Sequence, residues 1–241
     1  MPEREQPSLA MLAHERKLAV AIDGPSAAGK TTVGRALARL LEVPLLDTGL
    51  MYRAVTRAAQ DGGIDPCDSA AIESLSAGMK FSLAGVSDHS RLSVDGKAQE
   101  ETELHRYDID ATVSVVAAHP SVRRILVDAQ RRLAADTAIV MLGRDIGTVV
   151  LPDAWVKLFI TADPEIRAAR RRLEREADVT ANRTHDVAAQ LATRDFRDTT
   201  RETSPLRQAP DAILLETTST SSAETFERAR EAVARALGQE R

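Results

Sequence analysis

The stretch "AVAIDGPSAAGKTTVG", residues 19–34, constrains the fold more than any other part of the chain. An apolar run ends at Gly24, small residues follow, and Lys30, Thr31 and Thr32 come directly after Gly29. This is the spacing of a phosphate-binding loop between a buried strand and a helix. The two glycines permit backbone conformations that a side chain would forbid, so N–H groups can surround a phosphate. The helix that begins near Lys30 would present its positive end to the same anion.

Each position of this loop has a predicted role in binding a nucleoside triphosphate. The lysine would reach the outer phosphates, the first threonine hydroxyl would ligate magnesium, and the second would donate to an inner phosphate. The predicted ATP-binding residues are Gly24, Pro25, Ser26, Ala27, Ala28, Gly29, Lys30, Thr31 and Thr32. The loop alone does not separate a switch protein, a motor and a small-molecule kinase.

Apolar runs alternate with helical patterns along most of the chain. Such alternation favours an α/β fold, a parallel sheet with helices on both faces. The five predicted strands cover 18–23, 43–47, 137–143, 155–161 and 211–217. Between the second and third of these, residues 80–103 predict a small β-rich insert, in which "KFSLAG", "SRLSVDGK" and "QEET" read as short strands.

Composition narrows the class of protein. The chain has 241 residues and a net charge of −4, so we expect no binding to a nucleic acid polymer. It has no apolar run of 18 residues, so we expect no membrane span. The single cysteine, Cys67, excludes an internal disulfide and favours a reducing, cytoplasmic location. Residues 1–17 are predicted to be a flexible tail, and nothing demands more than a monomer.

Charged residues follow two of the predicted strands. Asp47 ends the second strand, and Arg144 and Asp145 come just after the third. Ligands of open α/β sheets bind outside the carboxyl ends of the strands. We therefore expect these three side chains to converge where the loop holds phosphate. The competing interpretation is a structural ion pair between Arg144 and one of the two acids.

Four motifs together resemble one family. "IDGPSAAGKTT", "LLDTGLMYR", "GRDIGTVVLPDA" and "RDFRDTTR", in this order and at these distances, are similar to bacterial cytidylate kinases, over about residues 18–237. The resemblance implies a P-loop NTPase-type core (18–65 and 120–241), a nucleoside-monophosphate domain (66–119) that carries the insert, and a helical lid at about 172–186. It also implies phosphoryl transfer from ATP, with Mg²⁺, to CMP or dCMP.

The resemblance also implies roles for individual residues. Thr48 would hold the sugar or base, and Arg53 and Arg144 would bind the acceptor phosphate. The implied catalytic residues are Lys30, Arg144, Asp145 and Arg194. The implied CMP-binding residues are Asp47, Thr48, Tyr52, Arg53, Ser114, Arg123, Arg144, Asp145, Arg194, Asp198 and Arg201. The implied lid arginines are Arg167, Arg170 and Arg171, and the implied metal ligands are Thr31 and Asp47.

The chemistry of the residues agrees with these roles. Two polyanionic phosphates repel each other unless cations lie between them, and phosphoryl transfer needs positioning and charge neutralisation more than a covalent catalyst. Arginine suits this task because its planar fork holds phosphate oxygens in pairs. Arg194, Arg197 and Arg201 share one face of a predicted helix, and Asp145 is our candidate for accepting a hydrogen bond from the cytosine amino group.

The sequence departs from the family pattern at one place. Where family members often carry Ile-Arg-Thr, this chain has Leu104, His105 and Arg106, so the arginine is either displaced by one position or replaced by histidine. Two other functions stay open at this point. One is a P-loop kinase for a different small acceptor, similar to shikimate or gluconate kinase, and the other is a non-catalytic nucleotide sensor.

Overall fold

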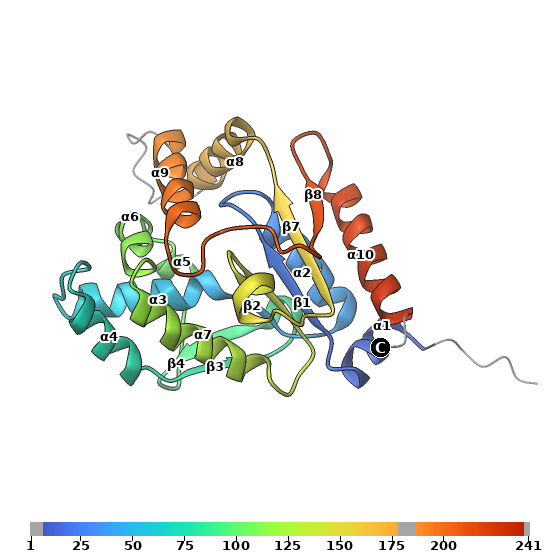
Figure 1. Cartoon of the computed structure of the whole chain (residues 1–241), viewed down its shortest axis with the longest axis horizontal. Coiled ribbons are helices and arrows are strands. Elements are labelled where there is room, and N and C mark those ends of the chain that lie inside the picture. The colour runs from blue at the N-terminus through green and yellow to red at the C-terminus, as the bar shows by residue number, and fades with distance from the viewer. Residues whose placement is uncertain (1–6, 178–186, 239–241) are drawn as a thin grey trace, which may run out of the picture.

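A twisted parallel sheet forms the centre of the computed structural model, which describes residues 7–177 and 187–238 (Figure 1). The five strands run in the order β2-β6-β1-β7-β8, with parallel pairing throughout. Their bounds are β1 (Ala19–Asp23), β2 (Leu45–Asp47), β6 (Ile139–Gly143), β7 (Val156–Thr161) and β8 (Ile213–Glu216). The prediction of an α/β fold with five parallel strands is therefore confirmed.

Helices cover both faces of the sheet. On one face, alternate strand residues such as Val20 and Ile22 pack against α1 (Leu9–Glu15), α2 (Lys30–Leu41) and α10 (Ser222–Gly238). On the other face, residues such as Ala21 and Met141 pack in one core with the remaining helices of that side. Those helices are α3 (Thr48–Asp61), α4 (Ser69–Gly78), α6 (Tyr107–Val116) and α7 (Pro120–Ala134).

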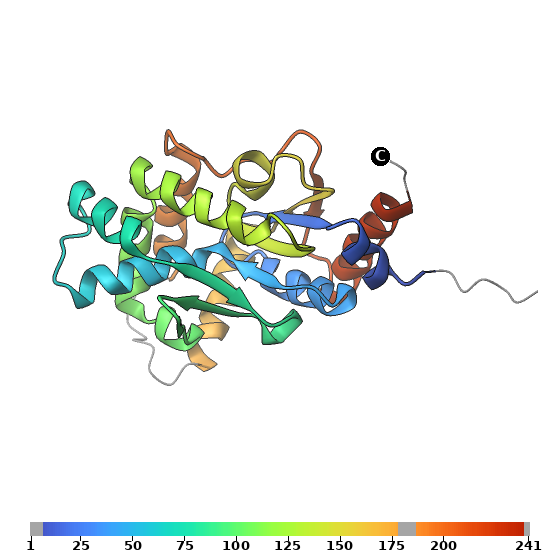
Figure 2. The same ribbon diagram turned by 90° about the horizontal axis from the view of Figure 1, so that it is seen from below.

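The predicted β-rich insert is a three-stranded antiparallel sheet (Figure 2). Its strands are β3 (Phe81–Ala84), β4 (Arg91–Val94) and β5 (Lys97–Ala98). A 3-10 turn, η1 (Ser87–His89), ties the insert to the core, because the Ser87 hydroxyl donates to the Ala38 carbonyl at 3.0 Å. The strand predicted at "QEET" is wrong: its last two residues begin helix α5 (Glu101–Leu104), which buries Leu104.

The N-terminal segment is also more ordered than predicted. Residues 9–15 form helix α1, which the Ser8 hydroxyl caps by accepting from the Met11 N–H at 3.1 Å. The helix buries Ala13, and Arg16 donates to the Leu237 carbonyl of α10 at 2.8 Å. The prediction of a flexible tail over 1–17 is therefore wrong for residues 9–15, because the apolar side of this helix packs against the hydrophobic core.

Two helices stand beyond the carboxyl edge of the sheet, α8 (Pro164–Ala177) and α9 (Val187–Thr200) (Figure 1). They lie side by side and share a small apolar cluster, Ala168, Val187 and Leu191. The predicted lid, about 172–186, coincides with the end of α8 and then with residues outside the described part of the chain, so the lid and the division into domains stay predictions. Within the described residues, no helix combines the length and the apolar character that crossing a bilayer requires.

Candidate active site

The phosphate-binding loop joins β1 to α2 as the sequence predicts. A Cβ atom on Gly24 would lie 1.9 Å from the Ile160 carbonyl oxygen, so only glycine fits where the loop passes strand β7. Gly29 has a φ of +96°, in the left-handed region that favours glycine, and α2 begins at the next residue. The sequence therefore folds locally into a tight loop that ends at a helix N-terminus, the arrangement that binds anions.

Lys30 lies buried inside this loop. Its ammonium donates to the Pro25 carbonyl at 2.6 Å, so a hydrogen bond within the loop fixes the position of this side chain. Burial, followed by the nearby Arg144, lowers the pKa of Lys30 well below its usual value. A bound anion would oppose both effects, because it supplies the opposite charge that this buried amine needs.

One cleft brings the loop together with every acceptor-site residue predicted from the sequence. Helix α3, helix α6, the segment after β6 and helix α9 supply its other walls. Besides loop residues 26–32, the cleft is lined by Asp47, Thr48, Tyr52, Arg53, Ser114, Arg123, Arg144, Asp145, Arg194, Asp198 and Arg201. Gly24 and Pro25 are not among the residues that line it, and neither are Arg167 and Arg170.

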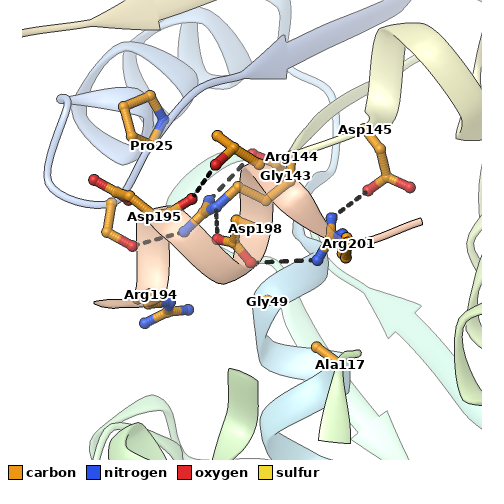
Figure 3. Close-up of polar contacts among 12 residues, drawn as sticks. Pro25, Gly49, Ala117, Gly143, Arg144, Asp145, Arg194, Asp195, Asp198 and Arg201 are labelled. Atoms are coloured by element: carbon orange, nitrogen blue, oxygen red, sulfur yellow. Dashed lines mark hydrogen bonds and ion pairs between the residues drawn. The ribbon is translucent and has the colours of Figure 1, made fainter. Parts of the chain in front are cut away.

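Asp198 links two arginines that line the cleft (Figure 3). One carboxylate oxygen accepts from Arg144 Nε at 2.8 Å, and the other accepts from Arg201 Nη1 at 3.3 Å. Arg144 Nη2 also donates to the Ser26 hydroxyl at 2.7 Å. Burial would raise the pKa of Asp198, but Arg144, Arg194 and Arg201 lower it, so the carboxylate stays charged. Arg144 therefore pairs with Asp198, and not with Asp47 or Asp145 as the competing interpretation of the sequence had it.

A second buried ion pair lines the same cleft. Arg123 is 2% exposed and donates to Asp145 at 2.7 Å, while its guanidinium lies 5.2 Å from the centre of the Tyr52 ring. Next to it, the Ser114 hydroxyl accepts a hydrogen bond from Arg197 at 2.9 Å. These contacts fix the orientation of Asp145 and Ser114 before a ligand arrives.

A third charged group connects helices α3, α6, α8 and α9. Asp110 of α6 forms ion pairs with Arg53, Arg171 and Arg194, at 2.5 Å to Arg53 and 3.6 Å to Arg194. Arg53 Nη1 also donates to the Leu104 carbonyl at 3.0 Å. Arg194 lines the cleft and makes no hydrogen bond with any described residue.

Comparison with known proteins identifies the family. The model of the cytidylate kinase family matches residues 20–235. The chain is 44% identical to a cytidylate kinase of Mycobacterium leprae over 211 residues, covering 87% of this chain and 92% of that one. It is 43% identical to a cytidylate kinase of Acidiphilium cryptum over 222 residues, covering 92% and 98%. The chain belongs to the cytidylate kinase family.

The fold of this family member also resembles a solved structure of low sequence identity. A crystal structure of an uncharacterised protein from Eubacterium ventriosum has a TM-score of 0.50 and 13% identity to this chain. The alignment covers 91% of this chain and 99% of that one, and supports the fold alone. The family match and the two curated relatives confirm the resemblance drawn from the four motifs.

The sequence analysis gave no individual role to three residues that position parts of this cytidylate kinase family site. Asp110 is the anion among three arginines, and Arg197 holds Ser114. The third, Asp23, ends β1, and its carboxylate accepts from the Ile146 and Gly147 N–H groups at 2.8 and 2.7 Å. Asp23 thereby ties the phosphate-loop strand to the π-helical turn η2 (Ile146–Val150), which follows Arg144 and Asp145. The sequence did contain a signal for Asp23, because an acidic residue ends the strand directly before Gly24 of the loop.

The predicted lid arginines have separate partners. Arg167 pairs with Asp195 at 2.5 Å and donates to the Ser26 carbonyl at 3.3 Å, so it connects the phosphate loop to helix α9. Arg170 donates to Thr217 beside β8. Of the three, only Arg171 lines the cleft that holds the acceptor-site residues.

The departure from the family pattern at Leu104–His105–Arg106 has a structural answer. His105 lines the cleft, whereas Arg106 is exposed and pairs with Asp108 at 3.0 Å. Histidine therefore replaces the arginine of the pattern at the cleft, and Arg106 does not substitute for it.

Proposed function

We propose that the protein is an ATP-dependent cytidylate kinase, which phosphorylates CMP and dCMP to CDP and dCDP and releases ADP. Family membership carries the reaction class. The observation that carries the substrate arrangement is the single cleft, because the phosphate loop and the arginines of the acceptor site line it together. A donor triphosphate on the loop and an acceptor phosphate on those arginines would meet in one space.

The proposed mechanism rests on charge neutralisation. Lys30 would contact the outer phosphates of ATP, and Arg144 would lie between donor and acceptor, because it already contacts Ser26 of the loop. Arg194, the guanidinium without a hydrogen bond to a described residue, would hold the acceptor phosphate with Arg53. These groups offset the repulsion between two anions and align the attacking oxygen, which is most of what phosphoryl transfer requires.

Recognition of cytosine would use Asp145 and Ser114. The Asp145 carboxylate is oriented by Arg123, and would accept a hydrogen bond from the cytosine amino group. A uracil carbonyl at the same place would face a carboxylate without a proton between them. Because Ser114 already accepts from Arg197, its own hydroxyl hydrogen is available to donate to a ring acceptor. Asp198 and Arg201 would hold the ribose.

The residues present fit a magnesium ion. Thr31 and Asp47 line the same cleft and offer hydroxyl and carboxylate oxygens, the donors that Mg²⁺ prefers. We propose that these two residues hold Mg²⁺, directly or through water. When bound with ATP, the ion neutralises charge on the phosphates.

The wider setting forms part of the proposal. We propose a monomeric, cytoplasmic enzyme that acts on free nucleotides and binds neither a nucleic acid polymer nor a membrane. Its net charge of −4 and its single cysteine support this. We also propose the division into a core, a nucleoside-monophosphate domain at 66–119, and a lid at about 172–186 that excludes water during transfer.

An acceptor panel tests the proposed function. ADP production from ATP and Mg²⁺ is measured with CMP, dCMP, UMP, AMP, GMP, shikimate and gluconate in turn. We expect CMP and dCMP to stimulate ADP production above all other acceptors. Stimulation by shikimate or gluconate would favour a kinase for another small acceptor, and stimulation by none of the acceptors would favour a nucleotide sensor. The match to the cytidylate kinase family favours neither of these two alternatives.

A further inference from the structure

Asp110 holds an unusual position among the charged groups around the cleft, because it contacts arginines that line the cleft without lining it itself. It lies in the first turns of α6, and its side chain is 8% exposed. Its carboxylate forms ion pairs with Arg53 of α3, Arg171 of α8 and Arg194 of α9. Burial would raise the pKa of Asp110, but the three arginines together lower it well below its usual value. Among the described residues, this carboxylate therefore pairs with three guanidinium groups, which come from three different helices.

These arginines need a counterion when no ligand is bound. Guanidinium groups do not lose their charge at any physiological pH, and like charges at short range in a buried site repel each other. Two carboxylates that line the cleft have different partners: Asp198 pairs with Arg144 and Arg201, and Asp145 with Arg123. Glu174, which also lines the cleft, pairs with Arg171 at 3.1 Å and gives that arginine a second counterion. Within the described residues, Asp110 is the only carboxylate within ion-pair distance of Arg53 or Arg194.

The same arginines are the proposed ligands of the acceptor phosphate. Arg53 donates from Nη1 to the Leu104 carbonyl and from Nη2 to Asp110, so the Asp110 carboxylate holds one edge of the guanidinium. A phosphate that binds this edge of the guanidinium competes with Asp110 for it, because both groups are anions that need the same donors. Arg194 lies 3.6 Å from Asp110 and makes no hydrogen bond to a residue that the structure describes, so it can receive the phosphate first.

We propose that Asp110 is an internal counterion that occupies the charge position of the acceptor phosphate in the empty enzyme and is displaced when the nucleotide binds. This inference rests on the proposed function, which supplies the acceptor. Asp110 keeps the arginines together and lowers the affinity for CMP, because binding must break its ion pairs. It is a positioning residue, and it touches neither nucleotide in the bound state.

The test compares Asp110→Asn with the wild-type protein. The variant keeps the size of the side chain and removes its charge. Isothermal titration calorimetry without ATP measures the Kd for CMP, for inorganic phosphate and for cytidine, which lacks the phosphate. We expect Asp110→Asn to bind CMP and inorganic phosphate about tenfold more tightly and cytidine with unchanged affinity. In steady-state assays we expect the KM for CMP to fall, and kcat to fall as well if product release becomes slower.

Matched controls separate this role from a general loss of charge. Asp211→Asn removes a carboxylate that pairs with Lys157 at 2.7 Å outside the cleft, and we expect no change in any of the three affinities. Asp110→Glu keeps the charge, so we expect it not to tighten phosphate binding. If Asp110→Asn binds CMP and phosphate with unchanged or weaker affinity, the proposal is overturned.

Rescue of folding by phosphate tests the proposal if the variants do not fold. If Asp110→Asn and the smaller Asp110→Ser both fail to fold alone, saturating inorganic phosphate should restore folding, since it supplies the missing counterion. Absence of that rescue would also overturn the proposal. The acceptor panel on the wild-type protein reports separately on the proposed function, because the phosphate measurements do not depend on which nucleotide the enzyme uses.

Discussion

Arg144 connects Asp198 of helix α9 to Ser26 of the phosphate loop through a single guanidinium group. Its Nε donates to the Asp198 carboxylate at 2.8 Å (Figure 3). Its Nη2 donates to the Ser26 hydroxyl at 2.7 Å. The donor half and the acceptor half of the cleft thus share one side chain. The position of this arginine depends on a carboxylate more than fifty residues further along the chain.

Replacement of Asp198 tests that dependence. Asp198→Asn removes the charge that holds both Arg144 and Arg201, and leaves two buried cations without their shared partner. We expect kcat/KM for CMP to fall about 100-fold, in line with the loss of a buried charge pair. Circular dichroism and steady-state kinetics measure folding and activity. Asp211→Asn should stay within about twofold of the wild type, and a similar result for Asp198→Asn would contradict the prediction.

Arg194 is expected to act on the acceptor phosphate. Burial, then Arg53 and Arg144, lower the pKa of Arg194 to about 10, so it remains a cation at neutral pH. We expect Arg194→Ala to raise the KM for CMP and to lower kcat together, with a loss of about 100-fold or more in kcat/KM. Arg194→Lys should recover only part of this, because an ammonium lacks the planar fork.

The control for Arg194 is an arginine outside the cleft. Arg230 of α10 pairs with Glu227 at 2.8 Å on the surface, so Arg230→Ala should leave both constants unchanged. Unchanged kinetics for Arg194→Ala would refute its assigned role.

Asp145 is expected to set the preference for cytosine. Asp145→Asn offers a uracil carbonyl a donor that the carboxylate cannot supply, so we expect the CMP-over-UMP ratio of kcat/KM to narrow by about tenfold or more. The variant also weakens the contact with buried Arg123, so its melting temperature should fall. The ratio, and not the absolute rate, carries the prediction; an unchanged ratio would move base recognition to another residue.

Asp23 predicts a pH dependence of stability. Burial raises the pKa of Asp23 to about 6, although two backbone N–H groups and Lys30 oppose the shift. Because the folded pKa exceeds the unfolded value of 3.8, the folded state binds more protons between these two values. The contribution of Asp23 to stability therefore falls as the pH rises from about 4 to about 6, by an amount on the order of 3 kcal/mol.

Urea unfolding of the wild type and of Asp23→Asn measures this effect. The asparagine does not titrate, so the difference in unfolding free energy between the two proteins isolates the carboxyl group. We expect the wild type to lose stability relative to Asp23→Asn across that pH range. A constant difference, or one that grows with pH, would contradict the raised pKa.

Short motifs of the sequence predicted which residues lie together in the cleft, whereas the roles of those residues stay predictions. The phosphate loop needs glycine at fixed positions, and Gly24 indeed passes a carbonyl too closely for any Cβ. The strand ends place Asp47 and Asp145 at one edge of the sheet, because parallel strands share that edge. Such features depend on local backbone geometry, and the sequence records that geometry directly.

Partners from distant segments could not be predicted in this way. Asp110 looks like an ordinary acid in the first turns of a helix, where the helix dipole alone would favour it. Only the tertiary structure brings Arg53, Arg171 and Arg194 to it. Helix α1 was missed for a different reason. Its capping residue, Ser8, can be read from the sequence, but the many charged residues nearby favoured a tail over a short amphipathic helix.

The contact between Lys30 and the Pro25 carbonyl has a consequence for chemical labelling. The chain has five lysines, and Lys30 is the only one of them that lines the cleft within the described residues. Reagents that acylate primary amines leave guanidinium groups untouched, so they have one target there. That amine is buried and engaged with its own loop. The rate of inactivation by such a reagent would thus report how often this loop opens and exposes the Lys30 amine. Bound ATP should slow that inactivation.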